Sequence, residues 1–306
     1  MSLRIERLSK TYANGTTALR DVSLTIPRGM FGLLGPNGAG KSTLMRIIAT
    51  LQEPDTGSVM FDSGQAQINV LEDKTALRRV LGYLPQEFGL YKNVSAEDLL
   101  DHFAVLKGIV AKTERREMVG RLLEQTNLAG DRKKHLGGYS GGMRQRFGIA
   151  VALLGAPQLI IVDEPTAGLD PAERLRFLNL LAELGQQAVV ILSTHIVEDV
   201  SELCSRMAII DKGEIRLEAD PLSAIAALRG RVFMRAVQRA ELATYNASHA
   251  VISTKLLAGR TVIRVLADAP PGDEFAPVEP SLEDVYFAAM RSRAEPELAA
   301  ALHTTA

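Results

Sequence analysis

The stretch Gly35-Pro36-Asn37-Gly38-Ala39-Gly40-Lys41-Ser42-Thr43 combines residue types that can bind a polyphosphate. It matches the pattern G-x-x-x-x-G-K-[ST] at every required position. Glycines lack a Cβ, so backbone N–H groups can turn inward around phosphate oxygens. Lys41 can place a positive charge against the β- and γ-phosphates, and the hydroxyl of Ser42 can reach Mg²⁺. The stretch predicts a phosphate-binding loop whose nucleotide contacts are Gly35, Asn37, Gly38, Gly40, Lys41, Ser42 and Thr43.

A second group of chemically capable residues follows the apolar run 159–162. Asp163 and Glu164 emerge where this run ends, and open α/β sheets bind ligands at the carboxyl ends of their strands. Asp163 can reach Mg²⁺ opposite Ser42, directly or through water. Glu164 can polarise a water for attack on a phosphate. Two carboxylates capping a turn are the simpler alternative, but a phosphate-binding loop in the same chain favours the catalytic interpretation.

Ser140-Gly141-Gly142 forms a third such group. Ser140 is a good helix N-cap, and the two glycines after it expose backbone N–H groups at the positive end of the helix that runs on from Met143. The segment therefore predicts a second anion site in a chain that already has a phosphate-binding loop. An ordinary capped helix start explains the same residues equally well, so the residues alone leave both interpretations open.

The elements around these groups alternate between strand and helix. We expect a strand over 30–34 before the loop and a helix over 44–49 after it, then strand 159–162, helix 171–184, strand 188–192, helix 197–204 and strand 207–210. This alternation predicts an α/β fold with a mostly parallel core sheet. The alternating strands 3–12 and 19–26 predict an N-terminal antiparallel β subdomain.

Residues from about 90 to 155 form a predicted helical subdomain, with a capping box at Ser95 and Asp98. We place the main domain at 1–220 and a small C-terminal α+β domain at 221–295, with strands over 232–237, 250–257 and 261–266 and a helix over 281–290. Residues 296–306 are predicted to be a disordered tail.

The amino-acid composition indicates which classes of partner and compartment to expect. Lys and Arg number 35 against 36 Asp and Glu, so the net charge of -1 gives no electrostatic reason to expect nucleic acid. The single cysteine, Cys204, excludes an intramolecular disulfide and is expected to be an inert buried thiol. No apolar run approaches the roughly 18–20 residues that cross a bilayer, so any membrane-spanning part is expected from another polypeptide.

The order of the motifs resembles the nucleotide-binding subunits of ABC transporters, which are P-loop NTPases. In that family the phosphate loop is followed by a strand-end glutamine, a helical subdomain with a Leu-Ser-Gly-Gly-Gln signature, a strand ending in Asp-Glu, a Gly-Leu-Asp turn and a lone histidine. The resemblance covers about residues 3–218, with Tyr139 and Met143 replacing the usual Leu and Gln. The matching residues are Gln86, Ser140-Gly141-Gly142, Asp163-Glu164, Gly168-Leu169-Asp170 and His195.

The resemblance implies a role for each matching residue. ATP would lie between the phosphate loop of one subunit and the Ser140, Gly141 and Gly142 segment of a second, head-to-tail subunit. The resemblance places Asp170 at the dimer seam and stacks Tyr12 on the adenine. Gln86 would touch Mg²⁺ or the attacking water, and His195 would hold the γ-phosphate and that water. A strand aromatic, a surface amide and a surface histidine are the plain structural alternatives for Tyr12, Gln86 and His195.

The same resemblance implies an ATPase, a homodimer that drives a separate integral membrane permease from the cytoplasmic face of the plasma membrane. The segment 279–286 resembles the close of single-domain ATPases that serve exporters of drugs, polysaccharides or heme, which favours export. Tyr83, Phe88 and Tyr91 are candidate contacts for the permease, with packing between subdomains as the alternative. Two other functions remain: an ABC ATPase that acts on a macromolecular complex without transport, and a regulatory module with little turnover.

Overall fold

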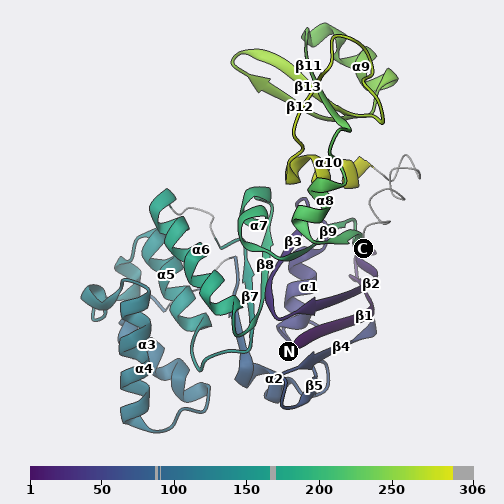
Figure 1. Ribbon diagram of the computed structural model, residues 1–306. Helices are drawn as coiled ribbons and strands as arrows, with labels where there is room; N and C mark the ends of the chain where they lie inside the picture. Colours follow the sequence, from purple (N-terminus) through teal and green to yellow (C-terminus); the bar gives the residue numbers. More distant parts are fainter. Residues whose placement is uncertain (87–88, 90, 166–169, 292–306) are drawn as a thin grey trace.

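The computed structural model of the protein describes residues 1–86, 89, 91–165 and 170–291. The strands form a six-stranded central sheet and two four-stranded sheets, one in each terminal part of the chain. Figure 1 shows the C-terminal part, coloured green to yellow, standing apart above the rest of the molecule. The expected tail 296–306 and the residues Phe88, Gly168 and Leu169 lie outside the described residues.

The central sheet has the strand order β10-β9-β3-β8-β7-β6. Neighbouring strands from β9 to β6 run parallel, whereas the edge strand β10 pairs antiparallel with β9. The predicted α/β fold with a mostly parallel core sheet is thereby confirmed. The strands are β3 (Gly29–Leu34), β6 (Leu81–Leu84), β7 (Leu159–Asp163), β8 (Val189–Thr194), β9 (Arg206–Asp211) and β10 (Glu214–Ala219).

The register of this sheet brings the motifs together. Every residue of β7 and of β8 is buried, as expected for apolar strands covered on both faces. Leu34, the last residue of β3, lies beside Thr194, and Asp163 lies beside Ser193. The strands β3, β8 and β7 are neighbours in the sheet and run parallel. The segments that follow them therefore all leave the sheet at the carboxyl ends of the strands.

The N-terminal sheet is antiparallel, with the order β2-β1-β4-β5. Leu3 and Ile5 alternate with exposed residues and join a core that also contains Phe61 and the helix residue Met45. This core holds the sheet against α1 (Lys41–Ile48) and the central sheet. The strands are β1 (Ser2–Thr11), β2 (Thr17–Pro27), β4 (Thr56–Asp62) and β5 (Gln67–Asn69).

Several helices pack against strands of the central sheet. The helix α2 (Lys74–Val80) was not expected; Asp73 caps it by accepting a hydrogen bond from the N–H of Ala76, and Leu77 is its buried residue. The helices α6 (Pro171–Gly185) and α7 (Val197–Leu203) follow β7 and β8 as predicted. Among the described residues, no helix is both long enough and apolar enough to span a membrane.

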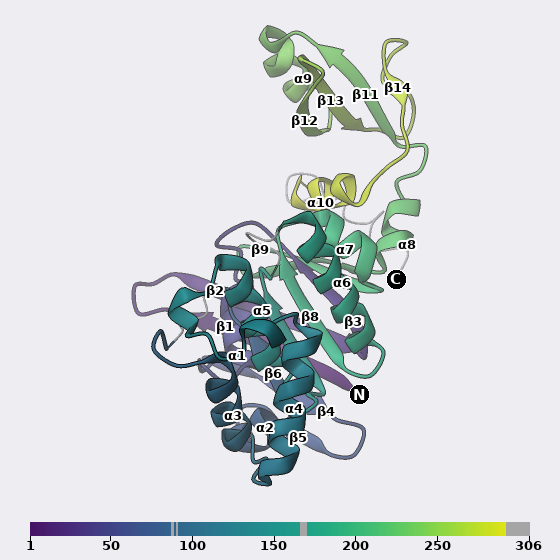
Figure 2. The ribbon, with the colours of Figure 1, turned by 90° about the vertical axis from the view of Figure 1, so that its left-hand side faces the viewer.

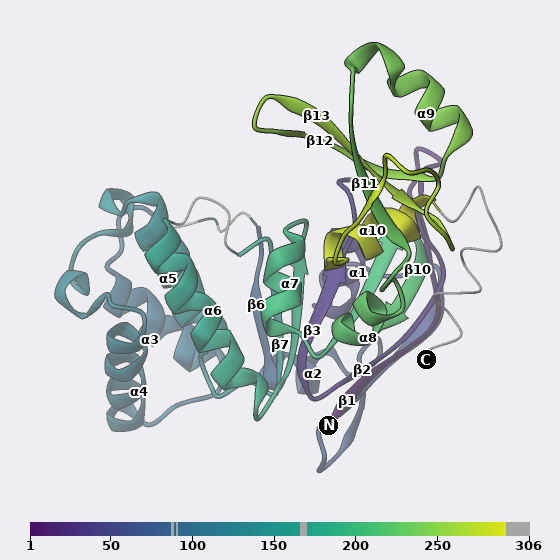
Figure 3. The same ribbon diagram turned by 45° about the horizontal axis from the view of Figure 1, so that its top comes forward.

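The helical region projects to the left of the central sheet in Figures 1 and 3, and it lies in front of the sheet in Figure 2. It contains α3 (Ala96–Leu106), α4 (Lys112–Gln125), α5 (Gly141–Ala152) and the short 3₁₀ turns Ala129–Asp131 and Leu136–Gly138. Ser95 caps α3, since its Oγ accepts from the N–H of Asp98 at 3.1 Å. The predicted capping box is only half formed, because the Asp98 carboxylate accepts from the Ser95 hydroxyl at 2.6 Å and not from its backbone.

The C-terminal part has an antiparallel sheet with the order β12-β13-β11-β14. Its last helix, α10 (Leu282–Arg291), packs on α7, α8, β9 and β10, and Figure 3 shows it lying between the sheet and the rest of the molecule. The other elements are α8 (Pro221–Ala226), β11 (Val232–Val237), the 3₁₀ turn Arg239–Glu241, α9 (Leu242–Ser248), β12 (Val251–Leu257), β13 (Arg260–Leu266) and β14 (Ala276–Pro277).

Cys204 at the end of α7 is buried, as expected, and burial raises the pKa of its thiol to about 12, with the charge of Asp199 as a smaller cause. We expect native protein at pH 8 to resist alkylation by iodoacetamide and unfolded protein to react at once. Because the folded pKa is raised, the neutral thiol stabilises the fold below the unfolded pKa of about 9, and this stability is lost as pH rises toward 12. Rapid labelling of the native protein would contradict this expectation.

Candidate nucleotide-binding site

The loop between β3 and α1 depends on its glycines. Gly40 caps α1 with φ 110°, and a Cβ there would lie 2.4 Å from the carbonyl oxygen of Ala18. A Cβ on Gly35 would lie 2.3 Å from the carbonyl oxygen of Ile210. Neither position has room for a Cβ, and the backbone conformation of Gly40 also disfavours any other residue type. The loop is held close to its neighbours, with its N–H groups at the start of a helix.

Lys41 is buried within this loop, with an exposed fraction of 6%. Its Nζ donates to the carbonyl oxygens of Gly35 at 2.6 Å and Pro36 at 3.2 Å, so the side chain folds back across the loop. Burial lowers the pKa of Lys41, while the charges of Glu164 and Asp163 partly oppose that shift. The loop thus holds a cation close to two carboxylates.

A pocket of about 300 Å³ opens over the loop. Nine of the predicted contact residues line it, together with the unpredicted Thr16, Thr17 and Ala18 of the β1–β2 turn and strand. A larger cavity of about 520 Å³ lies between α4 and α6 and contains none of the predicted residues. The predicted residues that share the smaller pocket are Tyr12, Asn37, Gly38, Gly40, Lys41, Ser42, Thr43, Gln86 and Glu164.

The two carboxylates at the end of β7 differ in their surroundings. Asp163 is 3% exposed, and its Oδ1 is buried without a hydrogen-bond partner. Glu164 adopts φ 53°, its N–H donates to the carbonyl oxygen of Ser193 at 2.8 Å, and its Oε2 lies 2.5 Å from Nδ1 of His195. Because a buried, unpaired carboxylate oxygen is costly, Asp163 suits a cation. Glu164 and His195 are brought together from the ends of β7 and β8.

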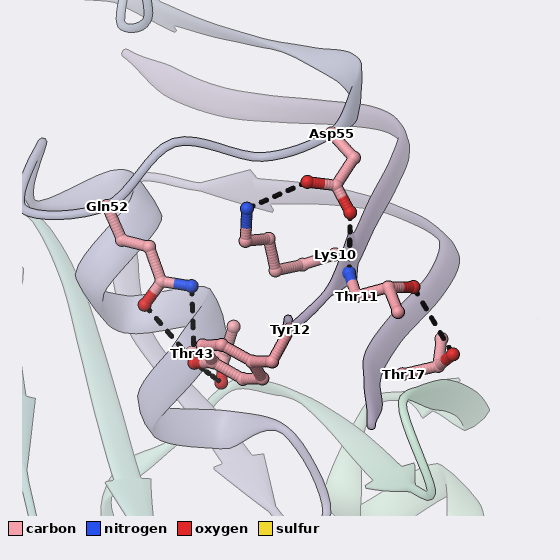
Figure 4. Close-up of polar contacts among 7 residues, drawn as sticks. All are labelled: Lys10, Thr11, Tyr12, Thr17, Thr43, Gln52 and Asp55. Carbon is pink, nitrogen blue, oxygen red and sulfur yellow. Dashed lines mark hydrogen bonds and ion pairs between the residues drawn. The ribbon is translucent and has the colours of Figure 1, made fainter. Parts of the chain in front are cut away.

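Tyr12 is tied to the helix that follows the phosphate loop (Figure 4). Its hydroxyl lies 3.0 Å from Oγ1 of Thr43 and 3.2 Å from the amide of Gln52. The end of β1 is also held, because Asp55 accepts from Nζ of Lys10 and from the N–H of Thr11. Tyr12 is 36% exposed and lines the pocket, so it offers an aromatic face there while its hydroxyl is anchored. Stacking on adenine remains a prediction.

The start of α5 lies outside this pocket. Ser140 caps the helix by accepting from the N–H of Met143 at 3.2 Å, and Asp170 caps α6 by accepting from the N–H of Glu173 at 2.9 Å. Beyond the adjoining residues and backbone of α5 itself, a Cβ on Gly141 or Gly142 would meet no atom of the described chain within 4 Å. Neither glycine is therefore required by its own chain, and the structure does not bring Ser140, Gly141, Gly142 or Asp170 to the phosphate loop.

Some site residues carried no signal that could have identified them. Gln52 follows α1 as a polar residue outside every motif, and it reaches Tyr12 only through the packing of the N-terminal sheet on that helix.

Two of the residues predicted to contact a permease differ in exposure. Tyr83 is half-buried in β6, where burial and the charge of Asp163 raise its pKa. Tyr91 is 67% exposed.

Comparison with known proteins agrees with this geometry. The family model described as ABC transporter matches residues 19–167. The chain is 38% identical to the uncharacterized ABC transporter ATP-binding protein YxlF of Bacillus subtilis, covering 70% of this chain and 69% of that protein. It is 38% identical to the doxorubicin resistance ATP-binding protein DrrA of Mycobacterium tuberculosis (71% and 65%), and 35% identical to the probable multidrug ABC transporter ATP-binding protein YbhF of Escherichia coli (71% and 37%).

Solved structures of ATP-binding cassettes also resemble this chain. The ATP-binding cassette MJ0796, in a dimeric post-hydrolysis state bound to ADP and Pi, superimposes with a TM-score of 0.65 at 29% identity, covering 71% of this chain and 98% of that one. The structure of an ATP-binding subunit of an ABC transporter gives a TM-score of 0.66 at 29% identity, covering 74% and 92%. From the site and these likenesses, the chain belongs to the ATP-binding proteins of ABC transporters, and it is an ATPase.

Proposed function

We propose that this chain is the ATP-hydrolysing subunit of an exporter, that it acts as a head-to-tail pair, and that it drives a separate membrane permease. The observation that carries the proposal is the separation of two predicted anion-binding features within one chain. The phosphate loop opens into a pocket, whereas the helix start at Ser140 lies outside it and is exposed. A second copy, turned head to tail, can bring that helix start against the nucleotide of the first.

The glycines of the helix start support this pairing. Gly141 and Gly142 have open space where a Cβ would stand, so nothing in their own chain demands glycine. The close approach of an anion to backbone N–H groups does demand it. A γ-phosphate held by the partner is such an anion, with Ser140 adding its hydroxyl and Asp170 lying at the seam between the subunits.

Within one site, each residue has a distinct task. The loop from Gly35 to Thr43 binds the phosphates through its N–H groups and Lys41, and the ring of Tyr12 stacks on the base. Ser42, Asp163 and Gln86 are the residues that would hold Mg²⁺, and the unpaired oxygen of Asp163 fits a cation. The bound ion would neutralise charge on the phosphates.

The attack itself depends on the pair at the ends of β7 and β8. Glu164 accepts a proton from the attacking water as general base. His195, 2.5 Å from Oε2 of Glu164, orients that carboxylate and the water. Both side chains come from strand ends whose register is set by the sheet, so their separation is set by a rigid part of the molecule.

Export through a separate permease is supported by the relatives and by the surface. YbhF is named for multidrug transport, and DrrA and the Bacillus subtilis protein LnrL are named for doxorubicin and linearmycin resistance, although import proteins such as MetN of Protochlamydia amoebophila also match at 33% identity. The helical region exposes Leu106 and Val110, at 69% and 79%, and Tyr91 precedes it. Exposed apolar side chains suit a protein contact. We place the subunit at the cytoplasmic face of the membrane through this contact.

The pairing is tested by Ser140→Arg, with Ser248→Arg at an exposed serine of the C-terminal part as the control. We expect Ser140→Arg to bind ATP normally, because its own phosphate loop is intact, and to lose hydrolysis on the order of 100-fold, because the long side chain fills the space that the partner's phosphate would occupy and the serine hydroxyl is lost. Specific activity of the wild type should rise with protein concentration. Full activity of Ser140→Arg, or a specific activity independent of concentration, would overturn the pairing.

The permease is tested separately by isolating the tagged chain from detergent-solubilised membranes. Recovery with a protein of several membrane-spanning helices supports the transporter subunit. Recovery only with ribosomes or with another water-extracted complex would overturn it.

A further inference from the structure

The helix α5 makes a contact that its role as an anion site does not require. Nε2 of Gln145, one turn after the Ser140 cap, donates to the carbonyl oxygen of Pro165 at 2.7 Å. Gln145 is half-buried and Pro165 is buried. Pro165 directly follows Glu164, so the helix that begins at Ser140 is bonded to the chain beside the catalytic carboxylate.

The backbone of Glu164 needs such support. Its φ of 53° lies in the left-handed region, which a non-glycine residue occupies at a cost. On one side, the N–H of Glu164 is fixed by the carbonyl oxygen of Ser193 at 2.8 Å. On the other side, the proline ring fixes φ of Pro165, and Gln145 holds the carbonyl that follows. The two bonds together leave Glu164 little freedom to turn.

The neighbours of Gln145 bind α5 to the rest of the molecule. Nε of Arg144 donates to the carbonyl oxygen of Tyr139 at 3.1 Å, just before the cap. Arg146 donates to the carbonyl oxygen of Asn127 at 2.9 Å and pairs with Glu173 of α6 at 3.6 Å. A displacement of the start of α5 is therefore carried along a stiff helix to the bond between Gln145 and the carbonyl of Pro165.

We propose that Gln145 is a positioning residue for Glu164, through which the helix start that binds the partner's nucleotide orients the general base of its own site. The idea rests on the proposed pairing of two subunits. When the partner's phosphate engages Ser140 and Gly142, α5 and Gln145 hold the Pro165 carbonyl and keep Glu164 aimed at the attacking water.

Gln145→Met tests the positioning role, since methionine has the same length and no donor. We expect kcat for ATP hydrolysis to fall on the order of 10- to 100-fold with KM for ATP unchanged, because a small displacement of a catalytic group has an effect of this size. Gln145→Lys keeps a donor and should recover part of the loss. Gln125→Met, at an exposed glutamine of α4, is the control and should change nothing. Equal thermal unfolding midpoints show that all variants fold.

A second measurement separates positioning of the base from damage to the helix start. In a Glu164→Gln background the base is already removed, so adding Gln145→Met should leave the ATP-induced dimer intact in light scattering. An unchanged kcat in Gln145→Met would overturn the proposal. Loss of the dimer in the double variant would also overturn it, because Gln145 would then serve the helix start and not Glu164.

Failure of the proposed pairing gives a different result. In that case Glu164→Gln by itself forms no dimer with ATP, and the wild-type specific activity is independent of concentration. The effect of Gln145→Met on kcat at constant KM still decides whether Gln145 positions Glu164 within one chain.

Discussion

Glu164→Gln is expected to lower kcat for ATP hydrolysis by about 10²- to 10⁴-fold, the usual contribution of a general base. The amide has nearly the same shape as the carboxylate but cannot accept the proton of the attacking water. Its neighbours, the Nδ1 of His195 and the backbone bond to Ser193, stay in place, so ATP affinity should change little. Steady-state hydrolysis and equilibrium binding of a fluorescent ATP analogue measure the two effects separately.

The matched control is Glu117→Gln on the exposed face of α4, which should hydrolyse ATP like the wild type. Because ATP is bound and not consumed, Glu164→Gln should also accumulate as an ATP-bound dimer. A variant that retains more than about a tenth of the wild-type kcat would show that another group is the base, since general-base catalysis contributes at least about 10²-fold.

Lys41→Met is expected to weaken ATP binding about 100-fold, equivalent to about 3 kcal/mol. The substitution keeps the length of the side chain and removes the cation from a buried position near Asp163 and Glu164. Two carboxylates without that cation repel a polyphosphate, so both the lost attraction and the uncovered charge act in the same direction. Titration with labelled ATP gives the affinity.

The wild-type lysine also predicts a dependence on pH. Burial places the pKa of Lys41 below its ordinary value of 10.5, so the ammonium loses its proton at a lower pH than an exposed lysine does. As the pH rises, the ATP affinity of the wild type should therefore begin to fall before pH 10.5 is reached. The Lys41→Met variant should lack this decline. Lys112→Met, at the exposed start of α4, is the control and should bind ATP normally. Unchanged affinity in Lys41→Met would contradict the assignment.

The local parts of the site could be predicted because their chemistry constrains short stretches of chain. A loop that wraps a phosphate needs glycines and a lysine at set spacings between a buried strand and a helix, and Gly35 to Lys41 meets that requirement in the sequence alone. The apolar run before Asp163 likewise predicts a buried strand with carboxylates at its end. The positions of β3, β7 and β8 follow the expected ranges closely.

Other contacts could not be predicted, because their partners are distant in the sequence and ordinary in type. The anchoring of Tyr12 by Gln52 depends on how the N-terminal sheet packs on α1. The bond from Gln145 to Pro165 depends on where α5 lies against the end of β7. The helix α2 was missed, since a short helix with one buried leucine gives little periodic signal.

From the order of its residues alone, this chain is recognisable as one that binds a nucleotide polyphosphate and holds two carboxylates for hydrolysis, since those properties reside in short, contiguous segments. The tertiary structure alone decides that Glu164 meets His195, that Tyr12 reaches Thr43, and that the helix start at Ser140 stands away from the phosphate loop. The physical reason is that strand register and helix packing set distances between segments, and these depend on the whole core and not on any one motif.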